Sequence, residues 1–98
     1  MFDEASYPTI TNTTFWHYTA DDGGGMYNSS SSPIITNTTF LHNAAGNGGG
    51  MYNGGGSPTI TNTTLSYNTT VYDGRRMYNI RSSPTITNSI FWENLTLM

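Results

Sequence analysis

The sequence predicts an all-β fold, a parallel β-solenoid of four coils with about 25 residues and three short strands in each coil. Three observations support this prediction. A repeat of that length runs through the whole chain, β-prone triplets recur between turn formers in every repeat, and like residues recur at a fixed offset. A solenoid explains the offset because equivalent positions in successive coils become stacked neighbours.

The repeat divides the 98 residues into four units of a single solenoid domain, which cover residues 1–25, 26–50, 51–76 and 77–98. Each unit contains a proline and many Thr, Ser and Asn residues, and most contain a glycine triplet, all of which disfavour helix. A meandering antiparallel sheet is the main alternative. It gives no reason for the fixed offset, so we favour parallel pairing between coils about 4.8 Å apart.

The strands are expected in the same order within each unit. In the second unit they fall at residues 26–28, 34–36 and 38–40. A glycine-rich segment precedes the first strand, Ser-Pro precedes the second, and Asn37 separates the second from the third. These residues are typical turn formers, so each coil is expected to have three turns.

Alternation of side chains assigns two columns of residues to the core. One column is the isoleucine of the second strand, and the other is the large apolar residue of the third strand. Small hydroxyl residues such as Thr38 are expected to face inward beside the second column. The predicted core stack comprises Ile10, Ile35, Ile60, Ile86, Phe15, Phe40, Leu65 and Phe91.

For the first strand, alternation alone does not decide which column of residues faces the core. Either the methionines at positions 1, 26, 51 and 77 or the aromatic residues that follow them face the core. Each choice also turns Arg75 or Arg76 inward, and a buried unpaired arginine is costly. A bulge or local bend before Met77 removes this conflict, and the third unit has one extra residue to form it. We expect the methionine column to face inward.

A column of asparagines follows the second strand. Its position in a tight turn calls for a left-handed backbone, which asparagine tolerates. Stacked side-chain amides can hydrogen-bond from coil to coil. We therefore predict an asparagine ladder formed by Asn12, Asn37, Asn62 and Asn88.

Two ranks of threonine are expected on the outward face of the second strand, roughly 7 Å apart along the strand and about 4.8 Å apart between coils. Ile34 interrupts one rank. The array resembles the ice-binding face of insect antifreeze solenoids, although threonine also favours any solvent-facing strand. The candidate ice-binding face comprises Thr9, Thr11, Thr36, Thr59, Thr61, Thr85 and Thr87.

The composition argues against several classes of protein. The chain has no lysine and only three arginines, so we expect no nucleic-acid partner. It has no cysteine for a disulfide or a cysteine zinc site. No apolar run approaches the roughly 20 residues of a membrane-spanning helix, so no membrane span is expected.

We predict no catalytic, cofactor or metal site. The acidic residues are spread over ends and turns, whereas a polysaccharide-cleaving enzyme needs acids that converge in a cleft. The column of Asp22, Asn47 and Asp73 offers calcium only two carboxylates, two coils apart. His17 and His42 share a column, but no third metal ligand accompanies them. We therefore expect a protein that is not an enzyme.

Exposed aromatic residues suggest a binding role. Trp16 and Trp92 share an outward column with Leu41, and the tyrosine column that follows the methionines adds a second apolar strip. Such strips are typical of a partner surface or of a platform on which sugar rings stack. Glycans are therefore a candidate ligand.

Two motifs carry a family resemblance. The GGGMYN segments at 23–28 and 48–53, together with Phe-x-x-Asn at Phe40/Asn43 and Phe91/Asn94, resemble the GGA[ILV] and FxxN repeats of polymorphic outer-membrane proteins and related bacterial surface proteins. The resemblance implies a right-handed parallel β-helix, or pectin-lyase-like, fold and an extracellular or cell-surface setting. It implies no single activity. The departures from the pattern are Tyr18, Leu65 and Arg75-Arg76.

The two ends of the sequence suggest self-assembly. A solenoid exposes unpaired strand edges at both ends, and no capping segment is evident in the chain. The coils either belong to a longer solenoid, such as a surface adhesin, or stack head to tail with further copies into a filament. We expect the filament, with ice or glycan binding as alternatives. The expected axial interface comprises Met1, Phe2, Asp3, Ile10, Asn12, Phe91, Asn94, Leu95, Leu97 and Met98.

Overall fold

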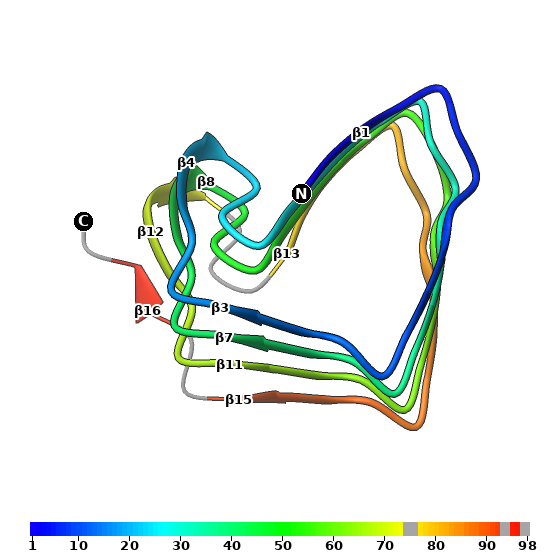
Figure 1. Cartoon of the computed structure of the whole chain (residues 1–98). Helices are drawn as coiled ribbons and strands as arrows, with labels where there is room; N and C mark the ends of the chain where they lie inside the picture. The colour runs from blue at the N-terminus through cyan, green and yellow to red at the C-terminus, as the bar shows by residue number, and fades with distance from the viewer. Residues whose placement is uncertain (74–76, 93–94, 97–98) are drawn as a thin grey trace.

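The computed structural model describes residues 1–73, 77–92 and 95–96, and within them it contains sixteen strands and no helix. Each coil follows the path of the coil before it (Figure 1). The strands of the first two coils are β1 (Phe2–Glu4), β2 (Thr9–Thr11), β3 (Thr14–Trp16), β4 (Thr19–Asp22), β5 (Met26–Ser29), β6 (Ile34–Thr36), β7 (Thr39–Leu41) and β8 (Ala44–Asn47). Those of the last two are β9 (Met51–Gly54), β10 (Thr59–Thr61), β11 (Thr64–Ser66), β12 (Thr69–Asp73), β13 (Met77–Ile80), β14 (Thr85–Thr87), β15 (Ile90–Trp92) and β16 (Leu95–Thr96).

The strands form four parallel sheets, and each strand pairs with its equivalent in the neighbouring coil. Paired residues are one sequence repeat apart: Ile35 lies between Ile10 and Ile60, and Ile60 pairs with Ile86. The all-β parallel solenoid predicted from the repeat is therefore confirmed.

Each coil contains a fourth strand that the sequence pattern did not indicate. The sheet β4-β8-β12-β16 follows the third corner of each coil. Most of its residues are small or polar, and they differ between coils: Ala20 pairs with Ala45, and Ala45 with Thr70. Pairing with the neighbouring coil, rather than intrinsic preference, keeps this segment extended.

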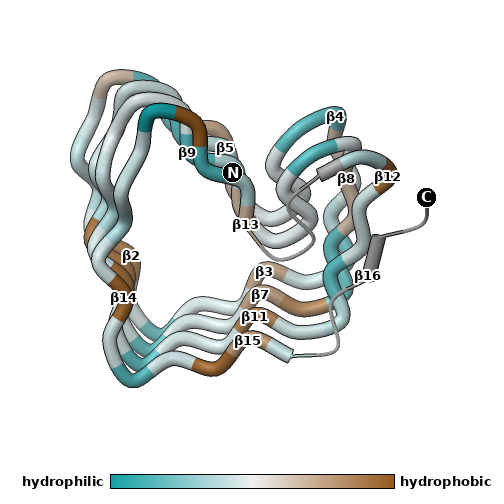
Figure 2. Tube along the Cα trace, turned by 180° about the vertical axis from the view of Figure 1, so that it is seen from behind, coloured by the Kyte–Doolittle hydropathy of each residue, from teal (hydrophilic) through white to brown (hydrophobic). Residues whose placement is uncertain are grey.

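The core is a narrow column of stacked apolar side chains. Figure 2 shows hydrophobic bands that continue from coil to coil along β2 and β14. Met26 and Met51 are fully buried, so the methionine column does face inward. The buried core comprises Ile10, Phe15, Met26, Ile35, Phe40, Met51, Ile60 and Leu65, with Met77 and Phe91 packed against it.

Ile86 is the one isoleucine of the predicted core stack that is not buried. Its side chain is 43% exposed, whereas those of Ile35 and Ile60 are 0% exposed. β14 is the last strand of its sheet, so no described coil covers this side chain. The end of the core is therefore open at Ile86.

The corner after the second strand has the predicted backbone. Asn12, Asn37, Asn62 and Asn88 all have φ between 49° and 53°. Residues with a left-handed backbone conformation also form two other corners. One includes Ala5 and Ser30, and the other is formed by His17, His42 and Tyr67.

Glycine is required where the fourth sheet turns back to the first. Gly23 has φ of 62°, and a Cβ there would lie 2.3 Å from the Met26 carbonyl oxygen. Two residues later, a Cβ on Gly25 would lie 2.6 Å from the Gly50 carbonyl oxygen. These contacts explain why a glycine triplet precedes both Met26 and Met51.

The extra residue of the third coil is taken up inside β12. Thr70 pairs with Ala45 and Asp73 with Asn47, so the register shifts between Thr70 and Asp73. This is a β-bulge upstream of Arg75 and Arg76, which themselves lie outside the described residues. The sequence indicated a bulge, and the structure places it earlier than expected.

Candidate functional site

The asparagine ladder is not in the predicted column. The side chains of Asn12, Asn37, Asn62 and Asn88 are exposed, because their left-handed corner directs them to water. The amide bonds run instead through Asn28, Asn53 and Asn79 in the first sheet. Asn28 Nδ2 donates to Asn53 Oδ1 at 2.8 Å, and Asn53 Nδ2 donates to Asn79 Oδ1 at 2.9 Å.

A second amide column lies at the corner between the third and fourth strands. Asn43 and Asn68 are fully buried. Asn43 Nδ2 donates to Asn68 Oδ1 at 3.1 Å and to the Phe15 carbonyl oxygen at 2.9 Å, and Asn43 Oδ1 accepts from the Tyr18 N–H at 3.0 Å. Asn43 is the asparagine of a Phe-x-x-Asn motif, so the motif spacing was the signal that could have located this ladder.

Asp3 occupies the ladder position in the first coil. It pairs with Asn28 in register, and only 6% of its surface is exposed. The Ser6 hydroxyl donates to Asp3 Oδ1. Asp3 Oδ2 and Asn28 Oδ1 are both buried without a hydrogen-bond partner. A carboxylate only accepts hydrogen bonds, so Asp3 cannot supply the donor that an asparagine would.

The two threonine ranks lie as predicted on the outer face of β2, β6, β10 and β14. Thr9, Ile34, Thr59 and Thr85 form one rank in register. The other rank is Thr11, Thr36, Thr61 and Thr87. Their side chains are exposed or half-buried, and Ile34 is 49% exposed.

The tyrosine column forms a continuous stack on the outside of the first sheet. Ring centroids are 5.0 Å apart for Phe2 and Tyr27, 4.8 Å for Tyr27 and Tyr52, and 5.2 Å for Tyr52 and Tyr78. The planes of the first two pairs lie within 6° of parallel. The ring faces therefore cover one another and present their edges to solvent, which is unsuited to stacking sugars. Burial raises the pKa of the Tyr52 phenol, and Tyr27 and Asp22 add to the effect.

A second aromatic strip follows the corner after the third strand. The Trp16 and His17 ring centroids lie 4.3 Å apart, His17 and His42 5.4 Å, and His42 and Tyr67 5.1 Å. Tyr67 meets Trp92 at 5.3 Å. The indoles of Trp16 and Trp92 are 59% and 48% exposed, so they remain candidate contacts for a partner.

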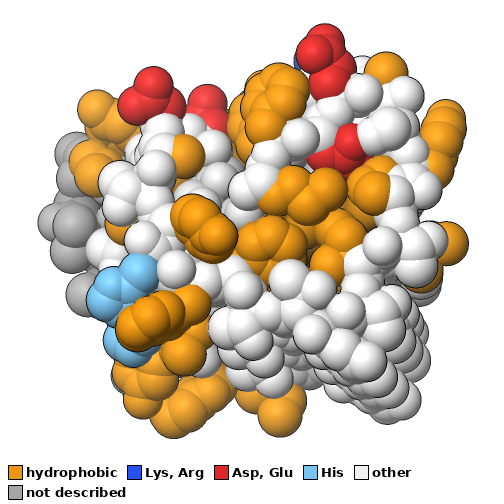
Figure 3. All heavy atoms as spheres, in the orientation of Figure 1, with side chains coloured by type: hydrophobic (Ala, Val, Ile, Leu, Met, Phe, Trp, Pro, Cys, Tyr) orange, Lys and Arg blue, Asp and Glu red, His pale blue; other side chains and the backbone are white. Residues whose placement is uncertain are grey.

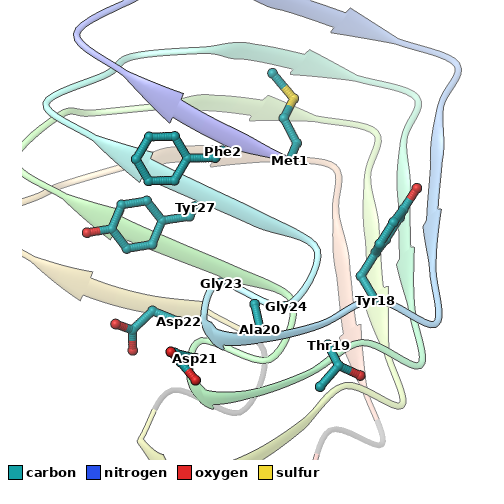
Figure 4. A pocket seen from close by; sticks show the side chains of 10 residues that line it. All are labelled: Met1, Phe2, Tyr18, Thr19, Ala20, Asp21, Asp22, Gly23, Gly24 and Tyr27. Atoms are coloured by element: carbon teal, nitrogen blue, oxygen red, sulfur yellow. The ribbon is translucent and has the colours of Figure 1, made fainter.

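A hollow of about 430 Å³ opens between the first and fourth strands of the first coil. Phe2 and Tyr27 form one wall, and Tyr18, Asp21 and Asp22 lie on the other side (Figure 4). Figure 3 shows acidic and hydrophobic side chains beside one another on this face. Asn47 Nδ2 donates to Asp22 Oδ1 at 2.9 Å, so the amide of the second coil contacts the carboxylate of the first directly. Over the described residues, no three His, Cys, Asp or Glu side chains form a metal-sized group.

A second hollow of about 420 Å³ lies at the open end of the core and is lined by Met77, Asn79, Ile86, Ser89 and Phe91. We call these five residues the C-terminal face. At the other end, Ile10 and Phe15 are only 8% and 7% exposed. The two ends therefore differ in how much apolar surface they offer.

The residues of the predicted axial interface differ in their exposure. Met1 and Phe2 are exposed and Phe91 is half-buried, whereas Asp3 and Ile10 are already buried within the first coil. Asn12 is exposed beside Ile10. Leu95 begins β16, and Asn94, Leu97 and Met98 lie outside the described residues.

In the described part of the chain, no helix has the length and apolarity needed to cross a membrane.

Comparison with known proteins identifies a family for the chain. No curated protein and no solved structure matches the chain. The family model described as a right handed beta helix region matches residues 1–96. That match spans nearly the whole sequence and agrees with the parallel coils, so the chain belongs to the right-handed β-helix family.

Proposed function

We propose that the chain is a non-enzymatic structural protein whose coils stack head to tail with those of further copies, forming a filament outside the cell or on its surface. The proposal rests on the C-terminal face. Ile86 is 43% exposed there although the equivalent Ile60 is fully buried, and Met77 and Phe91 lie around the same hollow. Burying this apolar surface favours association.

The first coil carries the side chains that would continue these columns. Met1, Ile10 and Phe15 are the first-coil equivalents of Met77, Ile86 and Phe91. Strands β13, β14 and β15 and strands β1, β2 and β3 are the outermost members of their sheets. Their outer edges can pair in parallel between copies, and such a contact repeats without closing.

The two partners in this contact contribute unequally. Ile10 and Phe15 already bury more than nine-tenths of their surface. The first coil therefore supplies mainly strand edges and the exposed Met1 and Phe2, while the C-terminal face supplies most of the apolar surface. Substitutions on the C-terminal face should accordingly weaken assembly most.

The surface setting is supported by sequence motifs. GGGMYN and Phe-x-x-Asn resemble repeats of polymorphic outer-membrane proteins and other bacterial surface proteins. The outer faces are rich in Thr, Ser and Asn and carry few charges. A larger surface adhesin would use the same coils, with another coil covering Ile86.

Electron microscopy and sedimentation test the filament. Purified protein at neutral pH should form fibres with an axial repeat of about 19 Å, because four coils each rise about 4.8 Å. Ile86→Lys should give monomers with an unchanged circular dichroism spectrum, since a charge on this face opposes burial. Ile34→Lys is the matched control, because Ile34 is similarly exposed on the side of the solenoid. A monomeric unmodified protein, or equal loss of fibres in both variants, would contradict the proposal.

The threonine ranks support ice binding as a second candidate function. Two exposed ranks in strict register give regularly spaced hydroxyl and methyl groups, and no charged residue lies in either rank. The unmodified protein should show thermal hysteresis, which Thr61→Lys should abolish by placing a charge in the centre of the array. Tyr72→Lys, at an exposed residue of β12, should leave it unchanged. Absence of thermal hysteresis in the unmodified protein would rule this function out.

A further inference from the structure

We propose that His17 and His42 together bind one divalent transition-metal ion, with Cu²⁺ held most tightly. They are the only histidines in the chain, and they follow the paired strands β3 and β7 at the same corner of adjacent coils. Figure 3 shows the histidine side chains at the surface beside hydrophobic ones. Neutral imidazole is a good ligand for copper, nickel and zinc.

The separation of the two rings suits a shared ion. Their centroids are 5.4 Å apart, and the planes meet at 63°. Two imidazoles that bind one ion through metal–nitrogen bonds of about 2.0–2.1 Å place their ring centroids roughly 5 Å apart. Rotation of the two side chains can therefore bring one nitrogen of each ring onto a single metal ion.

The backbone holds the two histidines in matching conformations. Their φ values are 62° and 56°, so both side chains leave the chain from the same left-handed corner. The His17 N–H donates to the Leu41 carbonyl oxygen at 3.2 Å, and the His42 N–H donates to the Ser66 carbonyl oxygen at 3.3 Å. These bonds fix the distance between the residues before a metal ion arrives.

Aromatic neighbours further restrict the imidazoles. Trp16 packs against His17 with ring centroids 4.3 Å apart, and Tyr67 stacks on His42 at 5.1 Å and 18°. Restricting rotamers before binding lowers the entropy lost on binding. Both histidines are exposed, so water molecules can complete the coordination of the ion. The one Lys or Arg side chain in the described residues, Arg81, follows β13 at a different corner.

Trp16 provides a direct readout, because bound Cu²⁺ or Ni²⁺ would lie close enough to quench its fluorescence. The experiment uses the full chain with Trp92→Phe, which leaves Trp16 as the only tryptophan. Titration with Cu²⁺ alone should give saturable quenching with one ion per chain. Ni²⁺ and Zn²⁺ should bind more weakly, with Zn²⁺ measured by competition.

Three single variants and one double variant of the same background decide the outcome. His17→Gln and His42→Gln should each weaken Cu²⁺ binding at least about tenfold, a loss of one ligand bond. Tyr67→His should strengthen it, because position 67 follows His42 in the column and already has a left-handed φ of 53°. Circular dichroism checks that each variant is folded. Quenching that persists in His17→Gln/His42→Gln, or a Tyr67→His variant that binds no more tightly, would overturn the proposal.

Discussion

Replacing Asn68 with alanine is expected to lower the free energy of unfolding by roughly 3–5 kcal/mol. The fully buried Asn68 accepts hydrogen bonds at Oδ1 from the Asn43 N–H at 3.0 Å and from Asn43 Nδ2 at 3.1 Å. Its own Nδ2 donates to the Phe40 carbonyl oxygen at 3.0 Å. Alanine removes all three bonds and leaves the buried Asn43 N–H and Phe40 carbonyl without these partners. Urea unfolding followed by circular dichroism measures the change.

Asn62→Gly is the matched control, because Asn62 belongs to the exposed column that the sequence predicted as the ladder. Glycine removes the amide but accepts the φ of 50° at this corner. Stability should change by no more than about 0.5–1 kcal/mol. If Asn62→Gly were as damaging as Asn68→Ala, the exposed column would carry stabilising amide contacts after all.

The repeat made the stacking of coils predictable, because a fixed offset has one simple structural meaning. Ile10, Ile35 and Ile60 are superimposed coil by coil as expected. The direction of the corner asparagines was not predictable in the same way. Alternation of side chains holds along a strand but stops at a left-handed corner, so the exposure of Asn37 and the burial of Asn43 do not follow from strand periodicity.

The fourth sheet was missed because its residues differ from coil to coil. Ala20, Ala45 and Thr70 are aligned by pairing and not by a shared pattern. The stacked rings were missed for a related reason. The sequence placed Tyr27 and Tyr52 in one column, but only their geometry shows that ring faces 4.8 Å apart cover each other. That geometry makes the tyrosine column unsuited to stacking sugars and leaves the exposed Trp16 and Trp92 as the candidate sugar contacts.

Asp3→Asn is expected to raise the free energy of unfolding by about 1–3 kcal/mol at neutral pH. Asp3 and Asn28 are adjacent in the ladder, and each has a buried side-chain oxygen without a donor. An asparagine at position 3 keeps Oδ1 to accept from the Ser6 hydroxyl and adds an Nδ2 that can donate to Asn28 Oδ1. The ladder would then contain four amides joined by three hydrogen bonds that all run in the same direction, as those donated by Asn28 and Asn53 already do.

Asp21→Asn separates this effect from a change in net charge, because it removes the same charge from an exposed side chain. Thermal and urea unfolding of the two variants should show a gain in stability for Asp3→Asn alone. Equal stability would mean that Asn28 donates toward Asp3. Asn53 would then have to donate toward Asn28, and Asn79 toward Asn53, because each amide oxygen needs a donor from the next coil. A single carboxylate at the head of the column would in that case set the direction of every hydrogen bond below it.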